Sequence, residues 1–128
     1  MFHVVLVEPE IPPNTGNIIR LCANTGAQLH LIEPLGFPLD DARMRRAGLD
    51  YHEFTAMKVH GDWDAFMNQV QPDPTRLFAI TTHGSQNFAH TRFLAGDVFV
   101  FGSETKGLDA NLRNQFPSQQ RLRLPMRP

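Results

Sequence analysis

The sequence predicts an α/β fold: a mostly parallel β-sheet with helices on both faces. Two observations carry this prediction. Short apolar runs alternate along the 128 residues with amphipathic stretches of helical period, which is the pattern of successive βαβ units. Apolar residues make up 41% of the chain, enough for a buried core, and the length corresponds to a single domain over residues 1–128.

The predicted strands are short apolar runs rich in β-branched and aromatic residues. The run at 3–8 (HVVLVE) is nearly continuous in apolar residues, and so is the one at 97–102 (DVFVFG), as expected for buried parallel strands. The run at 28–34 (QLHLIEP) is closed by a proline, which ends regular strand pairing. The remaining strands are predicted at 55–60, 75–82 and 121–125.

Amphipathic segments predict the helices between these strands. Residues 15–26 carry apolar side chains opposite a polar side. Residues 40–48 have acids in the first turn, arginines in the last and a closing glycine. Residues 62–70 place apolar side chains at i, i+3, i+4 and i+7, and residues 108–116 begin with Asp109 as a cap and end before a proline.

Several function classes are excluded by composition and spacing. No apolar run approaches the ~20 residues of a membrane span, and no basic region precedes the first apolar run, so a cytoplasmic location is expected rather than secretion. One cysteine cannot form an internal disulfide, and six histidines form neither HxH nor HExxH, so no metal site is expected. Ser85 and Ser103 lack the GxSxG elbow of serine hydrolases.

A polar stripe runs along the first predicted helix, in the segment NTGNIIRLCANTG at 14–26. Asn14, Asn17, Arg20 and Asn24 share one side of that helix. A solvated face is one interpretation. A ligand-binding face is the other, because the helix follows the first strand directly and α/β sites lie at strand ends. The planar guanidinium of Arg20 suits phosphate or carboxylate.

Loops at the carboxyl ends of strands are the places where α/β proteins bind ligands. They are TTHGSQN at 81–87, GSETKG at 102–107 and PMRP at 125–128. The glycine-bounded loop could bring backbone amides close to a ligand, or it could be an ordinary turn. It is not a Walker A loop, because Lys106 precedes the second glycine.

Positive charge is clustered although the net charge is −1. Arg43, Arg45 and Arg46 fall within four residues. All four charged residues that follow Asp109 are arginines. Such patches can hold phosphates on an otherwise neutral domain. The first cluster has an alternative interpretation as a helix end that complements its own dipole.

Two segments taken together resemble a known family. NTGNIIRLCANTG and VFVFGSETKGL are similar to the first and second signature motifs of the SPOUT class of RNA ribose methyltransferases, and EPEIPPNTGNIIR and RRAGLDYHEF around them strengthen the resemblance. The chain most resembles the small single-domain branch that methylates the 2′-hydroxyl of the wobble nucleotide, a cytidine or uridine, in tRNA. The similarity runs from Val4 to Met126.

This resemblance implies a C-terminal trefoil knot, S-adenosylmethionine bound within it, no metal, and a homodimer that holds the tRNA anticodon stem-loop across both subunits. It places the methyl-transfer chemistry at Arg20 and Glu104. It places cofactor contacts at Ile80, Thr81, Gly102 and Leu124. Expected RNA contacts are Asn14, Asn17, Arg43, Arg45 and Arg46. The knot-completing segment would follow Leu124, so the native protein is expected to be longer than this chain.

The expected geometry is one pocket formed by the turns at Ile80, Gly102 and Leu124 and bordered by Arg20. Three alternatives stay open: the same chemistry on ribosomal RNA, a non-catalytic RNA-binding module, and a flavodoxin-like signalling domain. The last is the weakest, because Glu8 and Glu10 do not supply the acceptor aspartate that such a domain carries after an early strand.

Overall fold

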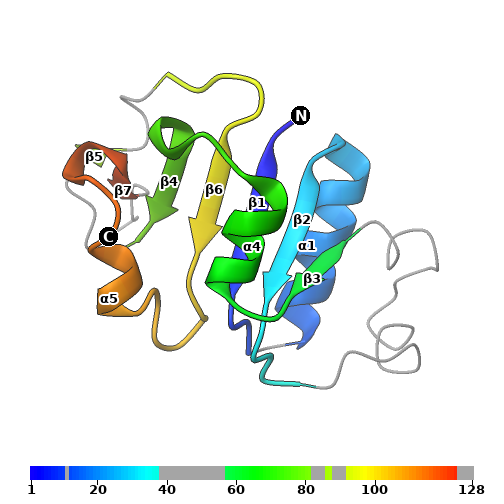
Figure 1. The fold of residues 1–128 in the computed structure, drawn as a ribbon. Coiled ribbons are helices and arrows are strands. Elements are labelled where there is room, and N and C mark those ends of the chain that lie inside the picture. The colour runs from blue at the N-terminus through cyan, green and yellow to red at the C-terminus, as the bar shows by residue number, and fades with distance from the viewer. Residues whose placement is uncertain (11, 38–56, 82–85, 88–91, 124–128) are drawn as a thin grey trace.

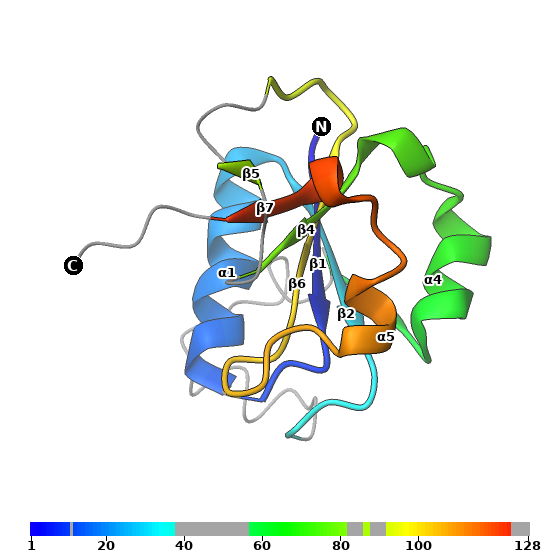
Figure 2. The same ribbon diagram turned by 90° about the vertical axis from the view of Figure 1, so that its left-hand side faces the viewer.

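A parallel sheet lies between helices on its two faces (Figures 1 and 2). A computed structural model describes residues 1–10, 12–37, 57–81, 86–87 and 92–123, so the predicted helix at 40–48 lies outside the described residues. The strands are β1 (His3–Val7), β2 (Gln28–Ile32), β3 (Lys58–His60), β4 (Leu77–Ile80), β5 (Gln86–Asn87), β6 (Val98–Phe101) and β7 (Arg121–Arg123). The helices are α1 (Pro12–Thr25), α4 (Trp63–Val70) and α5 (Ala110–Arg113), with 3₁₀ turns at Pro74–Arg76 and Ser118–Gln120.

The strand order is β3-β2-β1-β6-β4-β7-β5, and every pairing within it is parallel. From β1, the next two strands along the chain, β2 and β3, are added on one side. The later strands β4 to β7 all lie on the other side of β1. The order therefore reverses between β1 and β6, and ligands in such sheets bind beside the carboxyl ends of the strands at that point. The predicted α/β class with a parallel sheet is confirmed.

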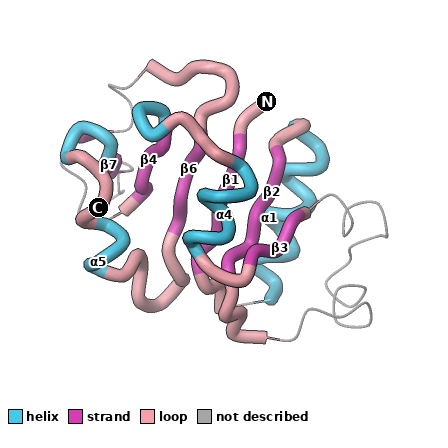
Figure 3. Tube along the Cα trace, viewed as in Figure 1, coloured by secondary structure: helices cyan, strands magenta, loops and turns pink. Residues whose placement is uncertain are grey.

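The helix α1 covers one face of the sheet, whereas α4 and α5 cover the other; Figure 3 shows α4 in front of β1 and β2 with α1 behind β2. Ile19 and Cys22 of α1 are buried against the sheet, and Leu21 points outward. Asp62 caps α4 by accepting a hydrogen bond from the backbone N–H of Ala65 at 2.7 Å. Its buried Phe66 anchors that helix.

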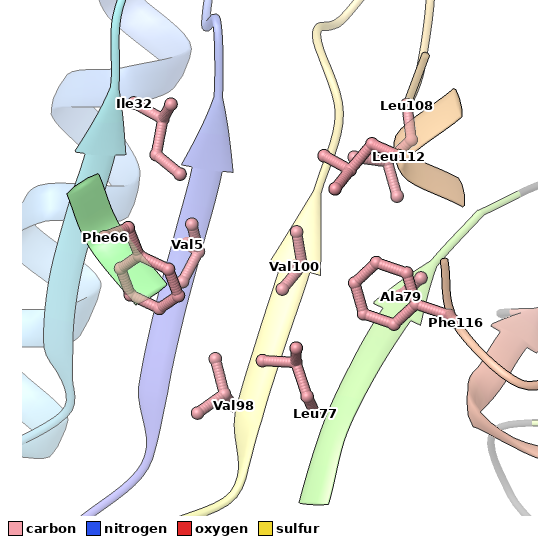
Figure 4. Packing of buried hydrophobic residues seen from close by; sticks show 10 residues of the cluster. All are labelled: Val5, Ile32, Phe66, Leu77, Ala79, Val98, Val100, Leu108, Leu112 and Phe116. Carbon is pink, nitrogen blue, oxygen red and sulfur yellow. The ribbon is translucent and has the colours of Figure 1, made fainter. Parts of the chain in front are cut away.

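Alternate residues of each strand serve the two faces, as the pleat requires. The face below α4 and α5 holds the larger cluster, to which the central strands and both helices contribute (Figure 4). Its members are Val5, Ile32, Phe66, Leu77, Ala79, Val98, Val100, Leu108, Leu112 and Phe116. The opposite face packs Leu6, Leu29 and Leu31 beneath α1.

Three histidine rings form a ladder across β1, β2 and β3. His3 Nδ1 lies 3.0 Å from His30 Nε2, and His30 Nδ1 lies 2.9 Å from His60 Nε2. His30 and His60 are buried, and the edge of Phe66 meets both rings. A neutral imidazole has one donor and one acceptor nitrogen, so neutral rings can satisfy both contacts. Burial, with the nearby His3, His60 and Lys58 charges, lowers the pKa of His30 to about 3.

Acid is expected to destabilise the protein through this ladder. Burial also lowers the pKa of His3 and of His60. An unfolded histidine takes up a proton near pH 6.5 while folded His30 stays neutral, so the stability present above that pH is lost as pH falls. Between pH 6.5 and 4.5 we expect His30 to account for a loss of about 2 kcal/mol in the free energy of unfolding.

Urea titrations at pH values from 4.5 to 7.5 check this expectation. A His30→Leu variant removes the titrating ring, so its stability should vary less steeply with pH than that of the unaltered protein, whatever its absolute stability. Equal slopes for the two proteins would show that the ladder does not couple folding to pH.

A buried carboxylate lies at the edge of the sheet where the amino ends of the strands meet. Asp97, which immediately precedes β6, is 1% exposed. It accepts hydrogen bonds from Arg76 Nε at 2.8 Å and from the backbone N–H of Leu94 at 2.7 Å. Arg76 also lies over the ring of Phe78, and its hydrogen bond to Asp97 raises the pKa of its guanidinium. This ion pair ties the turns before β4 and β6 together.

Candidate active site

The loop after β6 is a tight turn built by two glycines. An ideal Cβ on Gly102 would lie 2.1 Å from the backbone carbon of Gly107 and 2.1 Å from the nitrogen of Leu108, so only glycine fits there. Gly107 has φ +69° and donates its N–H to the carbonyl of Ser103 at 2.9 Å. The returning chain therefore packs directly on the end of β6.

The segment before α1 is clasped to this turn. The backbone N–H of Glu10 donates to Glu104 Oε2 at 2.7 Å, and the hydroxyl of Thr105 donates to Glu10 Oε1 at 2.7 Å. These hydrogen bonds from Thr105, with others from Ser103 and the charge of Lys106, lower the pKa of Glu10. The two motifs that are distant in sequence thus form one structural unit at the carboxyl edge of the sheet.

A first hollow of about 440 Å³ opens beside this turn, at the carboxyl ends of β4 and β6. Its volume lies in the range of small-molecule sites. Buried apolar side chains, polar backbone and two cationic side chains all contribute to its lining. The lining residues are Ile80, Thr81, Phe101, Gly102, Ser103, Glu104, Thr105, Lys106, Gly107, Leu108 and Arg113.

A second hollow of about 590 Å³ lies between α1 and the ends of β1 and β6. It is lined by Val4, Leu6, Asn14, Asn17, Ile18, Leu21, Cys22, Phe101, Gly102 and Glu104. The two hollows share Phe101, Gly102 and Glu104. A molecule in one hollow would therefore meet a molecule in the other at the turn after β6, which is the geometry required for group transfer between two bound partners.

The structure brings most of the described candidate residues to these hollows. Ile80, Thr81 and Gly102 line the first, Glu104 lines both, and the exposed Asn14 and Asn17 line the second. Arg20 is half-buried on α1 and is not among the described residues that line either hollow. The candidates Leu124, Arg43, Arg45 and Arg46, and the segment expected to lead into the knot, lie outside the described residues.

Sequence reasoning missed three contributors to this region. Glu10 was not singled out as a site residue, although it lies in the segment EPEIPP directly before the first motif, because its contact with Thr105 spans 95 positions. Lys106 and Arg113 line the first hollow. A basic side chain just after a glycine-bounded loop was the available signal for Arg113.

Within the described residues, no group of three histidine, cysteine or carboxylate side chains could hold a metal, and no helix is long and apolar enough to cross a membrane.

A parallel α/β sheet with paired hollows at a glycine-closed turn agrees with the class that the two motifs resemble, the SPOUT RNA methyltransferases. The chain belongs to the SpoU rRNA Methylase family, whose model matches residues 1–128.

Two similar proteins support this family, and a third shows the same fold. It is 73% identical over 128 residues to the tRNA (cytidine(34)-2′-O)-methyltransferase of Burkholderia cenocepacia (strain HI2424), covering all of this chain and 82% of that protein. A solved structure described as giving insights into 2-OH methylation of C/U34 on tRNA matches with a TM-score of 0.87 and 39% identity over 100% of this chain and 82% of its own. The SpoU methyltransferase AviRb of Streptomyces viridochromogenes, solved with AdoMet, shares the fold alone, with a TM-score of 0.75 and 21% identity over 98% of this chain and 51% of its own.

Proposed function

We propose that this protein transfers a methyl group from S-adenosylmethionine to the ribose 2′-hydroxyl of nucleotide 34, the wobble nucleotide of tRNA. The observation that carries the proposal is the shared wall of the two hollows, at Gly102 and Glu104, in a chain 73% identical to a protein named for this reaction. The described parts of both motifs meet at that wall.

The first hollow suits the cofactor. Ile80 and Leu108 offer apolar surface, and the polar turn from Gly102 offers backbone hydrogen-bonding groups, which is the mixture that nucleoside ligands need. When bound, S-adenosylmethionine supplies an electrophilic methyl group on a sulfonium. The task of the chain is then to fix the ribose oxygen in line with that methyl group, and proximity of this kind is worth several kcal/mol.

The α1 side of the second hollow suits RNA. Asn14 and Asn17 can hydrogen-bond sugar and phosphate oxygens there, and Arg43, Arg45 and Arg46 are our candidates for further phosphate contacts. We assign Arg20 to the phosphate beside the target ribose. A guanidinium keeps its proton in proteins, so Arg20 would not act as a base. Its positive charge would stabilise the negative charge that develops on the ribose oxygen. The proton of the ribose hydroxyl would pass to a phosphate oxygen or to water. Glu104, which lines both hollows, is the alternative proton acceptor.

Arg20→Lys is expected to lower kcat at least ~100-fold while the dissociation constant of S-adenosylhomocysteine stays within about threefold. Lysine keeps the charge and loses the planar fork that pins two oxygens at once. Single-turnover methylation and calorimetry measure the two quantities. Near-normal turnover of Arg20→Lys would show that the fork has no role in positioning.

The function itself is tested with the full-length protein, radiolabelled S-adenosylmethionine, and purified tRNA and ribosomal RNA as competing substrates. Label in tRNA that maps by mass spectrometry to the ribose of nucleotide 34 is the expected result. Label in ribosomal RNA alone would favour the first alternative. RNA binding without cofactor binding would favour the non-catalytic module.

We further propose a homodimer that binds the anticodon stem-loop across both subunits, working in the cytoplasm. The resemblance of the two motifs to those of the family supports this proposal. Light scattering of the full-length protein with and without an anticodon stem-loop measures the stoichiometry.

A further inference from the structure

The lining of the first hollow includes a guanidinium without an assigned role, that of Arg113. We propose that Arg113 binds the carboxylate of the methionine moiety of S-adenosylmethionine, and so distinguishes the complete cofactor from nucleosides that lack the amino-acid tail. This inference rests on the proposed function, because it takes the first hollow as the cofactor site. It adds an anchoring residue that neither motif contains.

The backbone that carries Arg113 is firmly held. It is the last residue of α5, which Asp109 caps by accepting a hydrogen bond from the N–H of Asn111 at 3.2 Å. Its neighbour Leu112 is buried in the larger core cluster, and so is Phe116, whose N–H donates to the carbonyl of Arg113 at 3.2 Å. The backbone from which the Arg113 side chain reaches the hollow is therefore fixed in position.

The side chain of Arg113 is half-buried and lines the hollow. Among the residues that the structure describes, none accepts a hydrogen bond from its guanidinium or pairs with its charge. Arg121, the next arginine along the chain, shows the contrast, because its Nε donates to the carbonyl of Phe116 at 2.8 Å. A partly desolvated guanidinium with its donors unused favours an anionic ligand that supplies the missing acceptors.

A basic residue in the last turn of a helix can also serve the helix dipole. That explanation is weak here, because α5 has only four residues and its last carbonyls are already used. The carbonyl of Ala110 accepts from the N–H of Asn114, and that of Leu112 accepts from the N–H of Gln115. The dipole does not account for the direction of the side chain into the hollow.

The position of Arg113 favours the cofactor over RNA. Arg113 lines the first hollow and not the second, whereas Asn14 and Asn17 line the second and not the first. Methyl transfer must occur at the shared wall of Gly102 and Glu104, so a group at Arg113 belongs to the cofactor end that points away from the RNA. A planar carboxylate also matches the fork of a guanidinium in a bidentate pair.

Calorimetry with two ligands isolates the contribution of the amino-acid tail that carries the carboxylate. S-adenosylhomocysteine carries the amino-acid tail, and 5′-methylthioadenosine lacks it. For the full-length protein, Arg113→Gln is expected to raise the dissociation constant of S-adenosylhomocysteine about 10- to 100-fold and to change that of 5′-methylthioadenosine less than about twofold. Arg113→Lys should fall between, since it restores the charge without the fork.

The matched control is Lys58→Gln, which removes an exposed cation of β3 that is not among the described residues lining either hollow. It should change neither dissociation constant more than about threefold, because β3 is the edge strand on the other side of β1 from the first hollow. A loss of S-adenosylhomocysteine affinity in Lys58→Gln as large as that in Arg113→Gln would overturn the assignment, because it would report the loss of net positive charge. An equal loss of affinity for both ligands in Arg113→Gln would overturn it too, because that result would mean that the substitution changes the shape of the hollow rather than a contact with the amino-acid tail.

A third measurement separates the cofactor from RNA. If Arg113→Gln weakened binding of a fluorescent anticodon stem-loop and left S-adenosylhomocysteine unchanged, the guanidinium would contact an RNA phosphate, and the inference would be wrong. Normal methylation with unchanged ligand binding in Arg113→Gln would refute this inference alone. Failure of the unaltered protein to bind S-adenosylhomocysteine would refute the proposed function as well.

Discussion

Replacing Gly102 with alanine is expected to weaken S-adenosylhomocysteine binding at least ~100-fold and to abolish methylation. A Cβ at this position would stand 2.1 Å from the backbone of both Gly107 and Leu108, and backbone cannot rotate away as a side chain can. The returning turn must therefore move off the end of β6. Because Glu104 and Leu108 belong to that turn, both hollows would change shape together. Calorimetry and a tRNA methylation assay measure the two effects.

Gly61→Ala is the matched control, because an added Cβ there meets no atom within 4 Å. It should leave binding and activity unchanged. The overpacked turn is also expected to lower the free energy of unfolding of Gly102→Ala by about 1–3 kcal/mol, so both variants are compared at a temperature where circular dichroism shows them folded. Binding by Gly102→Ala within about threefold of the unaltered protein would mean that the first hollow is not the cofactor site.

Local sequence pattern was sufficient to predict the sheet class and the two longer described helices. The predicted helix at 62–70 is confirmed as α4 with Asp62 as its cap, and the helix predicted at 15–26 is confirmed as α1, which begins at Pro12. Proline fits the first helical turn, where its missing N–H has no partner to lose. Apolar spacing reports burial on one face directly, which explains why these elements could be read from the sequence.

The prediction for 108–116 was too long, and the structure supplies the reason. The helix α5 ends at Arg113, after which the N–H groups of Gln115 and Phe116 bond to carbonyls three residues back. This tighter turn directs Phe116 into the core cluster. The short strand β5 was missed because Gln86 and Asn87 carry no apolar signal, and its pairing with β7 is decided by the backbone.

The site could be predicted only in part, because its essential contacts join distant segments. Strand-end logic pointed to the loop at 102–107, and the family resemblance implied Ile80 and Glu104, which line the first hollow. The adjacency of β1 and β6 and the clasp between Glu10 and Thr105 arise from sheet order, which no local window contains. Arg113 belongs to neither motif, and only the fold brings it beside Gly102.

Replacing Asp97 with alanine is expected to lower the free energy of unfolding by about 3 kcal/mol. The carboxylate is almost fully buried and accepts hydrogen bonds from Arg76 and from the backbone of Leu94. Its removal leaves the Leu94 N–H without its acceptor and leaves the guanidinium with the carbonyl of Arg92, 3.1 Å away, but no paired charge among the described residues. An unmet donor costs more than the hydrogen bond contributed. Asp97→Asn should lose less, since it keeps an acceptor oxygen. Urea denaturation measures both changes.

Asp64→Ala is the control, because Asp64 is an exposed acid in the first turn of α4 and should cost less than about 1 kcal/mol. Asp97 precedes β6 at the amino edge of the sheet, whereas the hollows open at its carboxyl edge. Asp97→Ala should therefore keep its affinity for S-adenosylhomocysteine at temperatures where it is folded, which separates loss of stability from loss of the site. Weakened binding by folded Asp97→Ala would show that the amino edge sets the geometry of the turn after β6. Stability equal to that of Asp64→Ala would show that the ion pair with Arg76 is not what holds the turns before β4 and β6 together.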